Sequence, residues 1–173
     1  MLLRRPGSAR RRWLVLSIQA LVLLLLYLGL RAWMQRDMAS GPVPELTTHL
    51  VSGDAFSTHD YRGKTWLLHF WAEWCAICKA EQGAISAVAE RWPVVTVAME
   101  SGDRLAVEDY LRAHGLDWPT VVDQTGSIAT RFGVKAVPAS FVIDGAGNIR
   151  FRETGYTTSW GLRLRLWLAS LLD

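Results

Sequence analysis

The sequence predicts an α/β domain with a central mixed sheet flanked by helices, preceded by one transmembrane helix. Three observations support this prediction: an uncharged apolar run near the start, strand-like segments that alternate with helix-like segments further on, and two cysteines three residues apart at one such junction. A chain of 173 residues has room for one ordinary domain and an appendage.

The apolar run covers residues 13–30, which are 18 residues without a charge. That length is enough for a helix to cross the hydrocarbon core of a bilayer. Five arginines precede the run, and only Arg31 and Arg36 follow it before the first acidic residue. The positive-inside rule therefore predicts a cytoplasmic basic N-terminus over residues 1–12, an anchor over residues 13–30, and the rest of the chain outside.

A cleaved signal peptide is the alternative interpretation of this segment. The apolar region of a signal peptide usually has about 7–15 residues and ends at a small-x-small cleavage site. The run here is longer, residues 31–36 contain no such site, and residues 38–40 are a weak candidate; Arg11 and Arg12 resemble a twin-arginine signal faintly. We expect an uncleaved anchor, which a soluble form beginning near residue 39 would contradict.

Charge divides the chain at the same place. Residues 1–36 contain seven arginines and no acidic residue, whereas residues 37–173 contain twelve basic and sixteen acidic residues, a net charge of −4. The overall charge of +3 and the pI near 9.1 therefore come from the flanks of the anchor. Because the main domain is acidic, we expect no nucleic-acid partner.

Residues 31–44 form the predicted linker, whose second half contains two prolines and a glycine and is expected to space the domain off the membrane. The domain over residues 45–173 begins with two short strands around a Gly53-Asp54 turn, between residues 49 and 57. After a loop at 60–64, the continuous apolar run 65–71 predicts a central strand covered by helices on both faces.

Helix-like and strand-like segments alternate over the rest of the domain. A helix follows Cys75 and ends before Pro93, then come strand 94–99, helix 103–114, a short strand at 118–122 and a short helix at 126–132. Residues 139–143 and 148–152 predict a hairpin, and residues 160–172 a final helix. The expected inward residues are Ile77, Ala80, Ala84, Ile85, Val88 and Ala89 in the first helix, and Leu162, Leu166, Leu168 and Ala169 in the last.

The only two cysteines, Cys75 and Cys78, stand where the central strand gives way to the first helix. At a helix N-terminus, unpaired backbone N–H groups and the positive end of the helix dipole stabilise a thiolate, which is the reactive form of cysteine. Cys78 lies nearly one turn further along, where we expect it to be more buried and close enough to form a disulfide. The spacing therefore predicts a redox-active dithiol in which Cys75 attacks and Cys78 resolves.

Half of a zinc site is the competing interpretation of this pair. Structural zinc needs four ligands, usually from a second Cys-x-x-Cys or from two closely spaced histidines. The sequence has no further cysteine, and its four histidines are scattered without such spacing. We predict no metal site and no organic cofactor, only the redox-active disulfide between Cys75 and Cys78.

Three stretches resemble the thioredoxin superfamily, and within it the membrane-anchored extracytoplasmic branch of TlpA, ResA, the cytochrome c maturation thioredoxins (CcmG) and the copper-sensitivity-suppressor D proteins (ScsD). They are residues 70–79 (FWAEWCAICK), residues 132–144 (FGVKAVPASFVID) with 145–150 after them, and residues 60–64 (DYRGK). The resemblance covers roughly residues 45–170. It implies a thioredoxin fold with an N-terminal β-hairpin and a strand and helix inserted between the two longer motifs.

The resemblance assigns further residues to the site. It implies that Pro138 is cis and faces the dithiol, which exposes the backbone of Val137 for pairing with a substrate segment; a strand-starting proline is the alternative. It also implies that Glu81, one helical turn beyond Cys78, lies beneath the site and accepts a proton from Cys78. An ordinary solvated glutamate is the alternative there.

Two places depart from the family pattern. His69 stands where cytosolic thioredoxins have a buried aspartate, and it either relays a proton or is a hydrogen-bonded packing residue. Ala76 and Ile77, between the cysteines, replace the proline and the histidine of other members. The absence of that histidine favours a weak oxidant or a reductant.

Tryptophans are expected both at the site and in the core. Trp71 and Trp74 flank the start of the cysteine motif, so we expect them to form an apolar collar beside Cys75. Trp66, Trp92 and Trp118 are expected to be core residues.

These observations predict a membrane-tethered thiol–disulfide oxidoreductase that exchanges disulfides with protein partners through Cys75 and Cys78 and acts as a reductase. The resemblance implies a single-pass protein of the bacterial inner membrane, with a cytoplasmic N-terminus and a periplasmic thioredoxin-like domain. It implies disulfide- or dithiol-containing protein substrates and, for a reductase, a membrane thiol electron donor of the DsbD or ScsB type. The alternatives are a disulfide-forming oxidase and a copper-binding or chaperone-like module with the dithiol as Cu(I) ligands; a link to copper stress rests on the resemblance alone.

Overall fold

The computed structural model describes residues 7–172, so the arginines at positions 4 and 5 of the predicted basic N-terminus lie outside the described residues. The chain divides into two compact units, Met1–Arg36 and Asp37–Asp173.

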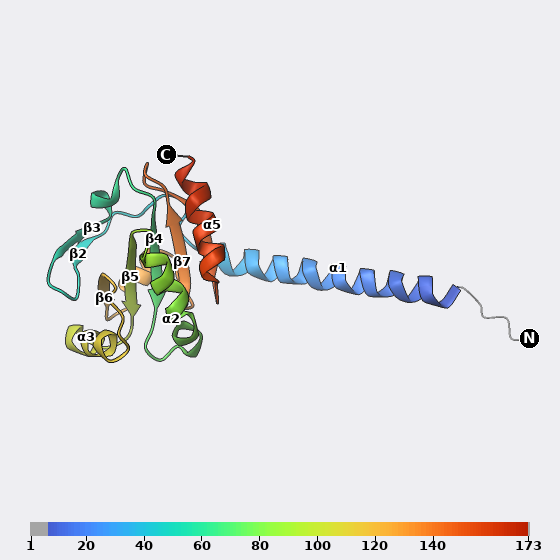
Figure 1. The fold of residues 1–173 in the computed structure, drawn as a ribbon, viewed down its shortest axis with the longest axis horizontal. Coiled ribbons are helices and arrows are strands. Elements are labelled where there is room, and N and C mark those ends of the chain that lie inside the picture. Colours follow the sequence, from blue (N-terminus) through green and yellow to red (C-terminus); the bar gives the residue numbers. More distant parts are fainter. Residues whose placement is uncertain (1–6, 173) are drawn as a thin grey trace, which may run out of the picture. The chain divides into compact units, whose positions relative to one another are not determined.

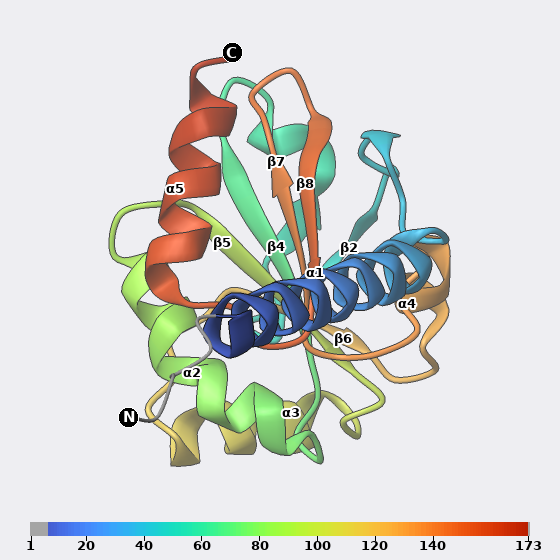
Figure 2. The same ribbon diagram turned by 90° about the vertical axis from the view of Figure 1, so that its right-hand side faces the viewer.

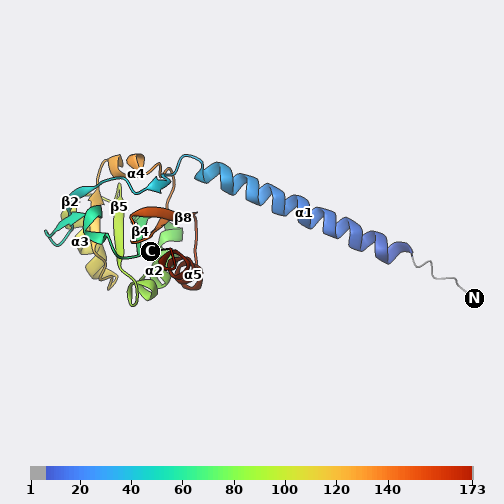
Figure 3. The same cartoon turned by 90° about the horizontal axis from the view of Figure 1, so that it is seen from above.

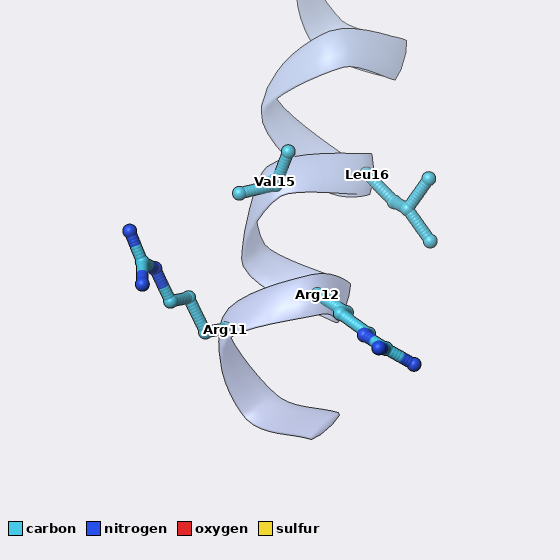
Figure 4. Close-up of a pocket in the computed structure, with 4 residues that line it drawn as sticks. All are labelled: Arg11, Arg12, Val15 and Leu16. Atoms are coloured by element: carbon cyan, nitrogen blue, oxygen red, sulfur yellow. The ribbon is translucent and has the colours of Figure 1, made fainter. Parts of the chain in front are cut away.

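The first unit is helix α1 (Gly7–Gln35; Figure 1). From Arg11 to Gln35 this helix is long and apolar enough to cross a membrane, by length and composition. Figure 4 shows Arg11 and Arg12 on one turn and Val15 and Leu16 on the next, all pointing away from the helix. The helix continues past residue 30, where the predicted anchor ends, because residues 31–35 contain neither glycine nor proline.

The second unit is built on a six-stranded sheet with the strand order β1-β8-β7-β4-β5-β6. Strands β4, β5 and β6 are parallel to one another, whereas β7 is antiparallel to β4, β8 to β7 and β1 to β8. A separate antiparallel pair, β2 and β3, is the predicted N-terminal hairpin. The strands are β1 (Gly41–Pro42), β2 (Thr47–His49), β3 (Ala55–Ser57), β4 (Trp66–Trp71), β5 (Val94–Met99), β6 (Thr120–Asp123), β7 (Ala139–Ile143) and β8 (Asn148–Thr154).

Helices cover both faces of this sheet, as the mixed α/β prediction requires. Helices α2, α3 and α5 pack on one face, and α4 packs with the β2–β3 hairpin on the other (Figures 2 and 3). All residues of β4 are buried as a result, which confirms the prediction from its continuous apolar run. The helices are α2 (Ala76–Ala89), α3 (Arg104–Ala113), α4 (Ser127–Arg131) and α5 (Ser159–Ser170), with a 3₁₀ turn, η1 (Thr58–Tyr61). This is the predicted thioredoxin fold.

The inward face of α2 differs from the prediction. Its buried residues are Cys78, Glu81, Ile85 and Val88, whereas the predicted inward residues Ile77, Ala80 and Ala89 are exposed. The burial of Ile85, Val88 and Cys78 is as predicted, but the helix is turned so that the Glu81 carboxyl points inward and Ile77 points outward. In α5, Leu162, Leu166 and Ala169 are buried as predicted, but Leu168 is exposed.

Residues 37–44, predicted to be a spacer, pack against the domain. Met38 is buried in the apolar cluster of the α4 face, and the Ala39 N–H donates a hydrogen bond of 2.9 Å to the Phe132 carbonyl. Strand β1 then pairs with β8. Gly133, with φ +67°, lies so close to the Asp37 backbone that a Cβ atom would have no room there. The chain is therefore fixed to the domain from residue 37 onward.

Candidate active site

Cys75 is the N-cap residue of α2, directly after the central strand β4 and the turn that follows it. It forms a disulfide with Cys78, and the two Cα atoms are 5.2 Å apart. The Cys78 backbone N–H donates to Cys75 Sγ at 3.1 Å. The sulfur of Cys75 therefore occupies the position in which a helix N-terminus stabilises a negative charge. Both side chains are largely buried.

The loop before β7 faces this disulfide. The Val137–Pro138 peptide bond is cis, as the family resemblance implied. The Val137 carbonyl oxygen lies 3.6 Å from Cys75 Sγ, and the Pro138 carbonyl accepts a hydrogen bond of 2.8 Å from the Gly155 N–H. Because Pro138 is buried and Val137 is half-buried, the Val137 backbone is the part of the loop next to the sulfur and near solvent.

Glu81 is completely buried on the same face of α2 as Cys78. Its Oε1 accepts a hydrogen bond of 2.9 Å from the Thr157 backbone N–H. Its Oε2 has no hydrogen-bond partner within the described residues 7–172. Burial raises the pKa of this carboxyl from 4.5 to about 7, although the Thr157 hydrogen bond opposes the shift. A carboxyl with such a pKa can take up and release a proton near neutral pH.

His69 lies in the middle of β4 and is buried. Its Nδ1 is 2.9 Å from Ser140 Oγ on the neighbouring strand β7. Burial lowers the pKa of the imidazole to about 3, so the side chain is neutral near pH 7. This geometry is that of a hydrogen-bonded packing residue, the alternative to a proton relay.

Of the two tryptophans predicted to form a collar beside Cys75, one is buried and the other is exposed. Trp71 is buried in the same apolar cluster as both cysteines, and its indole N–H donates to Thr96 Oγ1 at 3.1 Å. Trp74 is exposed, and its indole N–H donates to the Glu100 carbonyl at 3.2 Å. Only Trp74 therefore forms part of the outer surface, together with the exposed Ala76 and Ile77 between the cysteines.

Two residues at the site were missed by the sequence analysis. Thr157 contributes only its backbone N–H, so its residue type gives no indication of this role. Glu100 has φ +46°, which is unusual for a residue other than glycine; its carbonyl orients Trp74, and the sequence offered only a loop after strand 94–99. Among residues 7–172, no group of three or more His, Cys, Asp or Glu side chains is arranged to hold a metal ion.

The chain is similar to known proteins in both sequence and fold. Residues 40–152 match the AhpC/TSA family. A thioredoxin-like protein of Haemophilus influenzae is 32% identical over 139 residues, which cover 79% of this chain and 83% of the relative. The thiol:disulfide interchange protein DsbE of Pseudomonas fluorescens biotype C is 31% identical over 153 residues, or 84% and 86% of the two chains. The crystal structure of StoA from Bacillus subtilis superposes with a TM-score of 0.59 at 27% identity, covering 73% of this chain and 98% of that one.

Proposed function

The chain belongs to the AhpC/TSA family and is a thiol–disulfide oxidoreductase, and we propose that it is membrane-tethered and reduces disulfides in protein partners. The observation that supports this most strongly is the Cys75–Cys78 disulfide at the N-terminus of α2, next to the cis-Pro138 loop. Relatives named as thiol–disulfide interchange proteins agree with it.

In the proposed reaction, the Cys75 thiolate attacks one sulfur of the partner's disulfide. A bond forms between Cys75 and that sulfur, the partner's own S–S bond breaks, and the leaving thiolate takes a proton. Cys78 then attacks Cys75 Sγ, which closes the Cys75–Cys78 disulfide and releases the partner's second thiol. Two electrons pass from this chain to the partner, and an external dithiol must restore them.

Glu81 serves the second step as proton acceptor. It is buried on the face of α2 that carries Cys78, and its pKa of about 7 suits a base at neutral pH. Its Oε2 has no other partner within the described residues. The carboxyl therefore has one oxygen fixed by Thr157 and one oxygen available for a proton.

The exposed rim is where a partner segment binds. The backbone of Val137 lies beside Cys75 Sγ, so an extended segment that pairs with it brings its own disulfide to that sulfur. Trp74, Ala76 and Ile77 present an exposed and mainly apolar surface beside the same sulfur.

The direction of transfer is reductive in this proposal, because no histidine between the cysteines stabilises the Cys75 thiolate. The substrates are disulfide-containing proteins, and the electron source is a membrane thiol donor of the DsbD or ScsB type. We further propose that the chain is one of the copper-sensitivity-suppressor D proteins and acts in copper stress.

Helix α1 tethers the domain to the inner membrane in this proposal, with the N-terminus in the cytoplasm and the domain in the periplasm. Trp13 and Trp33 are separated along the helix by 20 residues, or about 30 Å, the thickness of the hydrocarbon core. Tryptophans at both ends of a span are typical of membrane–water interfaces. The Arg36 guanidinium lies over the Trp33 ring at 5.2 Å, at the predicted outer end.

Trapping with serine variants tests the reaction. Cys78→Ser retains the attacking thiol but cannot resolve, so we expect a stable mixed disulfide with a disulfide-containing test protein. Cys75→Ser is the matched control and is expected to trap nothing. Equal trapping by both variants, or by neither, would refute the assignment of Cys75 as nucleophile.

A further inference from the structure

Helix α5 is apolar on two opposite sides. Leu162, Leu166 and Ala169 are buried against the sheet and α2. A second set of large apolar side chains points away from the domain: Trp160, Leu164, Trp167, Leu168 and Leu171, with exposed fractions of 78%, 55%, 52%, 38% and 61%. At 3.6 residues per turn, these five fall within an arc of about 100° that is centred opposite the buried three. We call this set the outer stripe of α5.

An exposed apolar surface of this kind marks an interaction site, because isolated domains rarely leave so many large side chains in water on one helix. Nothing in the fold of residues 37–172 covers the outer stripe, since all five residues are at least partly exposed. The stripe shares no residue with the exposed surface beside the dithiol, which is formed by Trp74, Ala76, Ile77 and the Val137 backbone.

The composition of α5 fits a lipid interface. The helix contains two arginines and no acidic residue. Arg163 and Arg165 lie on the two edges of the outer stripe, where they pair with Glu90 and Glu153 of the domain. A helix that combines tryptophan and leucine on one side with arginines along its edges is typical of segments that lie in the plane of a membrane interface.

The attachment of the chain favours the bilayer as the partner. The Met38 carbonyl accepts a hydrogen bond of 3.0 Å from Arg152 Nη1, and Met38 Sδ is 3.2 Å from Thr154 Oγ1. Thr154 lies four residues before Thr158, the N-cap of α5. The incoming chain is therefore fixed to β8, the strand that directly precedes α5 in the sequence. Helix α1 ends three residues before Met38, and three residues span at most about 11 Å.

We propose that the outer stripe of α5 lies in the interfacial layer of the bilayer that α1 spans. This inference rests on the membrane tether of the proposed function. Thr157, in the loop that leads into α5, donates its backbone N–H to Glu81. This hydrogen bond links the start of the proposed membrane-contacting helix directly to the buried carboxyl of the dithiol site. A domain docked in this way holds its dithiol close to the membrane surface, which suits partners whose thiols lie there.

Spin labels on the full chain in phosphatidylcholine–phosphatidylglycerol vesicles test the proposal. Three single variants are labelled in the oxidised protein, in which Cys75 and Cys78 are protected: Leu164→Cys in the outer stripe, Leu105→Cys on α3 as an exposed control, and Leu21→Cys within α1. Collision rates with oxygen, which concentrates in lipid, are compared with those of a water-soluble nickel chelate. We expect oxygen to dominate at positions 164 and 21 and the chelate at position 105.

Each outcome has a definite meaning. If position 164 behaves like position 105 while position 21 is in lipid, the docking of α5 is wrong and the tether stands. If position 21 is also accessible to the chelate, the proposed tether fails. Dipolar broadening at position 164 that disappears on dilution with unlabelled protein would identify a second copy as the partner and would also overturn the proposal. Trp167→Gln added to Leu164→Cys is expected to increase access of the chelate severalfold.

Discussion

The Thr157 backbone N–H donates a 2.9 Å hydrogen bond to Glu81, a carboxyl that is otherwise enclosed by the domain. The bond links the loop before α5 to the face of α2 that carries Cys78. It fixes one carboxylate oxygen and leaves the other without a partner among residues 7–172. Burial outweighs this single hydrogen bond, so the pKa of Glu81 rises to about 7.

Glu81→Gln tests the proton acceptor. We expect the second step, attack by Cys78, to slow by about a hundredfold at pH 8, because general-base catalysis is lost. The rate of the unaltered protein should rise with pH through about 7, where Glu81 loses its proton, and the variant should lack that rise. Stopped-flow measurement of mixed-disulfide decay gives both quantities. Glu90→Gln, at the end of the same helix, is the control, and an unchanged profile in Glu81→Gln would refute the role.

The same carboxyl should make stability depend on pH. Its folded-state pKa of about 7 lies above the ordinary 4.5, so the folded state holds the proton more tightly than the unfolded state. The contribution is fully present below pH 4.5 and is lost as the pH rises to about 7, by about 3 kcal/mol in total. Urea unfolding of Glu81→Gln should lack this loss. Parallel stability curves for the two proteins would contradict the shifted pKa.

His69→Asn should lower the stability of the domain but leave the rate of disulfide exchange nearly unchanged, as expected for a packing residue. The pKa of His69 is lowered from 6.5 to about 3 by burial, so its stability contribution is present above pH 6.5 and is lost as the pH falls toward 3. Asparagine can still bind Ser140, but the smaller side chain should cost about 1–2 kcal/mol at pH 7. The variant should lose less stability than the parent between pH 6.5 and 4. An exchange rate that falls more than about tenfold at pH 7 would favour the relay instead.

Glu100→Gly should stabilise the domain. Glu100 has φ +46°, a conformation that costs a residue with a Cβ about 1 kcal/mol relative to glycine. The Trp74 indole binds the backbone carbonyl of residue 100, so the hydrogen bond survives the substitution. We expect a gain of about 1 kcal/mol in urea unfolding, with Trp74 still held. Asp109→Gly, within α3, is expected to change stability in the opposite direction.

Leu162 and Leu164 form a matched pair on α5. Leu162→Ala should cost about 3 kcal/mol, because Leu162 is completely buried. Leu164→Ala should cost less than about 0.5 kcal/mol in detergent solution, since that side chain is more than half exposed. Near-ultraviolet circular dichroism during urea unfolding measures both changes. Equal losses would mean that the helix is oriented differently from the structure.

Much of this organisation was predictable because local signals agreed with one another. The continuous apolar run of β4 and the following Cys-x-x-Cys placed Cys75 at the start of α2, where the structure has it. Hydrophobic periodicity predicted the burial of Ile85 and Val88 correctly, but it wrongly assigned Ile77 to the core and cannot assign Glu81 there. The burial of Glu81 depends on the Thr157 N–H, which comes from 76 residues further along the chain.

The prediction that residues 37–44 form a free spacer was wrong for a similar reason. Prolines and a glycine indicate an extended, turn-rich segment but do not show whether it packs. Gly133 and the edge of β8 create the surface on which Met38 and β1 lie, and neither is local to that segment.

The reduction potential of the Cys75–Cys78 couple decides whether the protein reduces or oxidises its partners. Equilibration of the purified full chain with glutathione or dithiothreitol buffers, with the two redox forms separated by thiol alkylation, gives this value. We expect a reversible two-electron couple at about −270 mV, as in thioredoxin, which makes the protein a reductase that needs a membrane donor. A value nearer ~ −120 mV would reverse the direction of transfer, and the absence of a reversible couple would contradict disulfide exchange altogether.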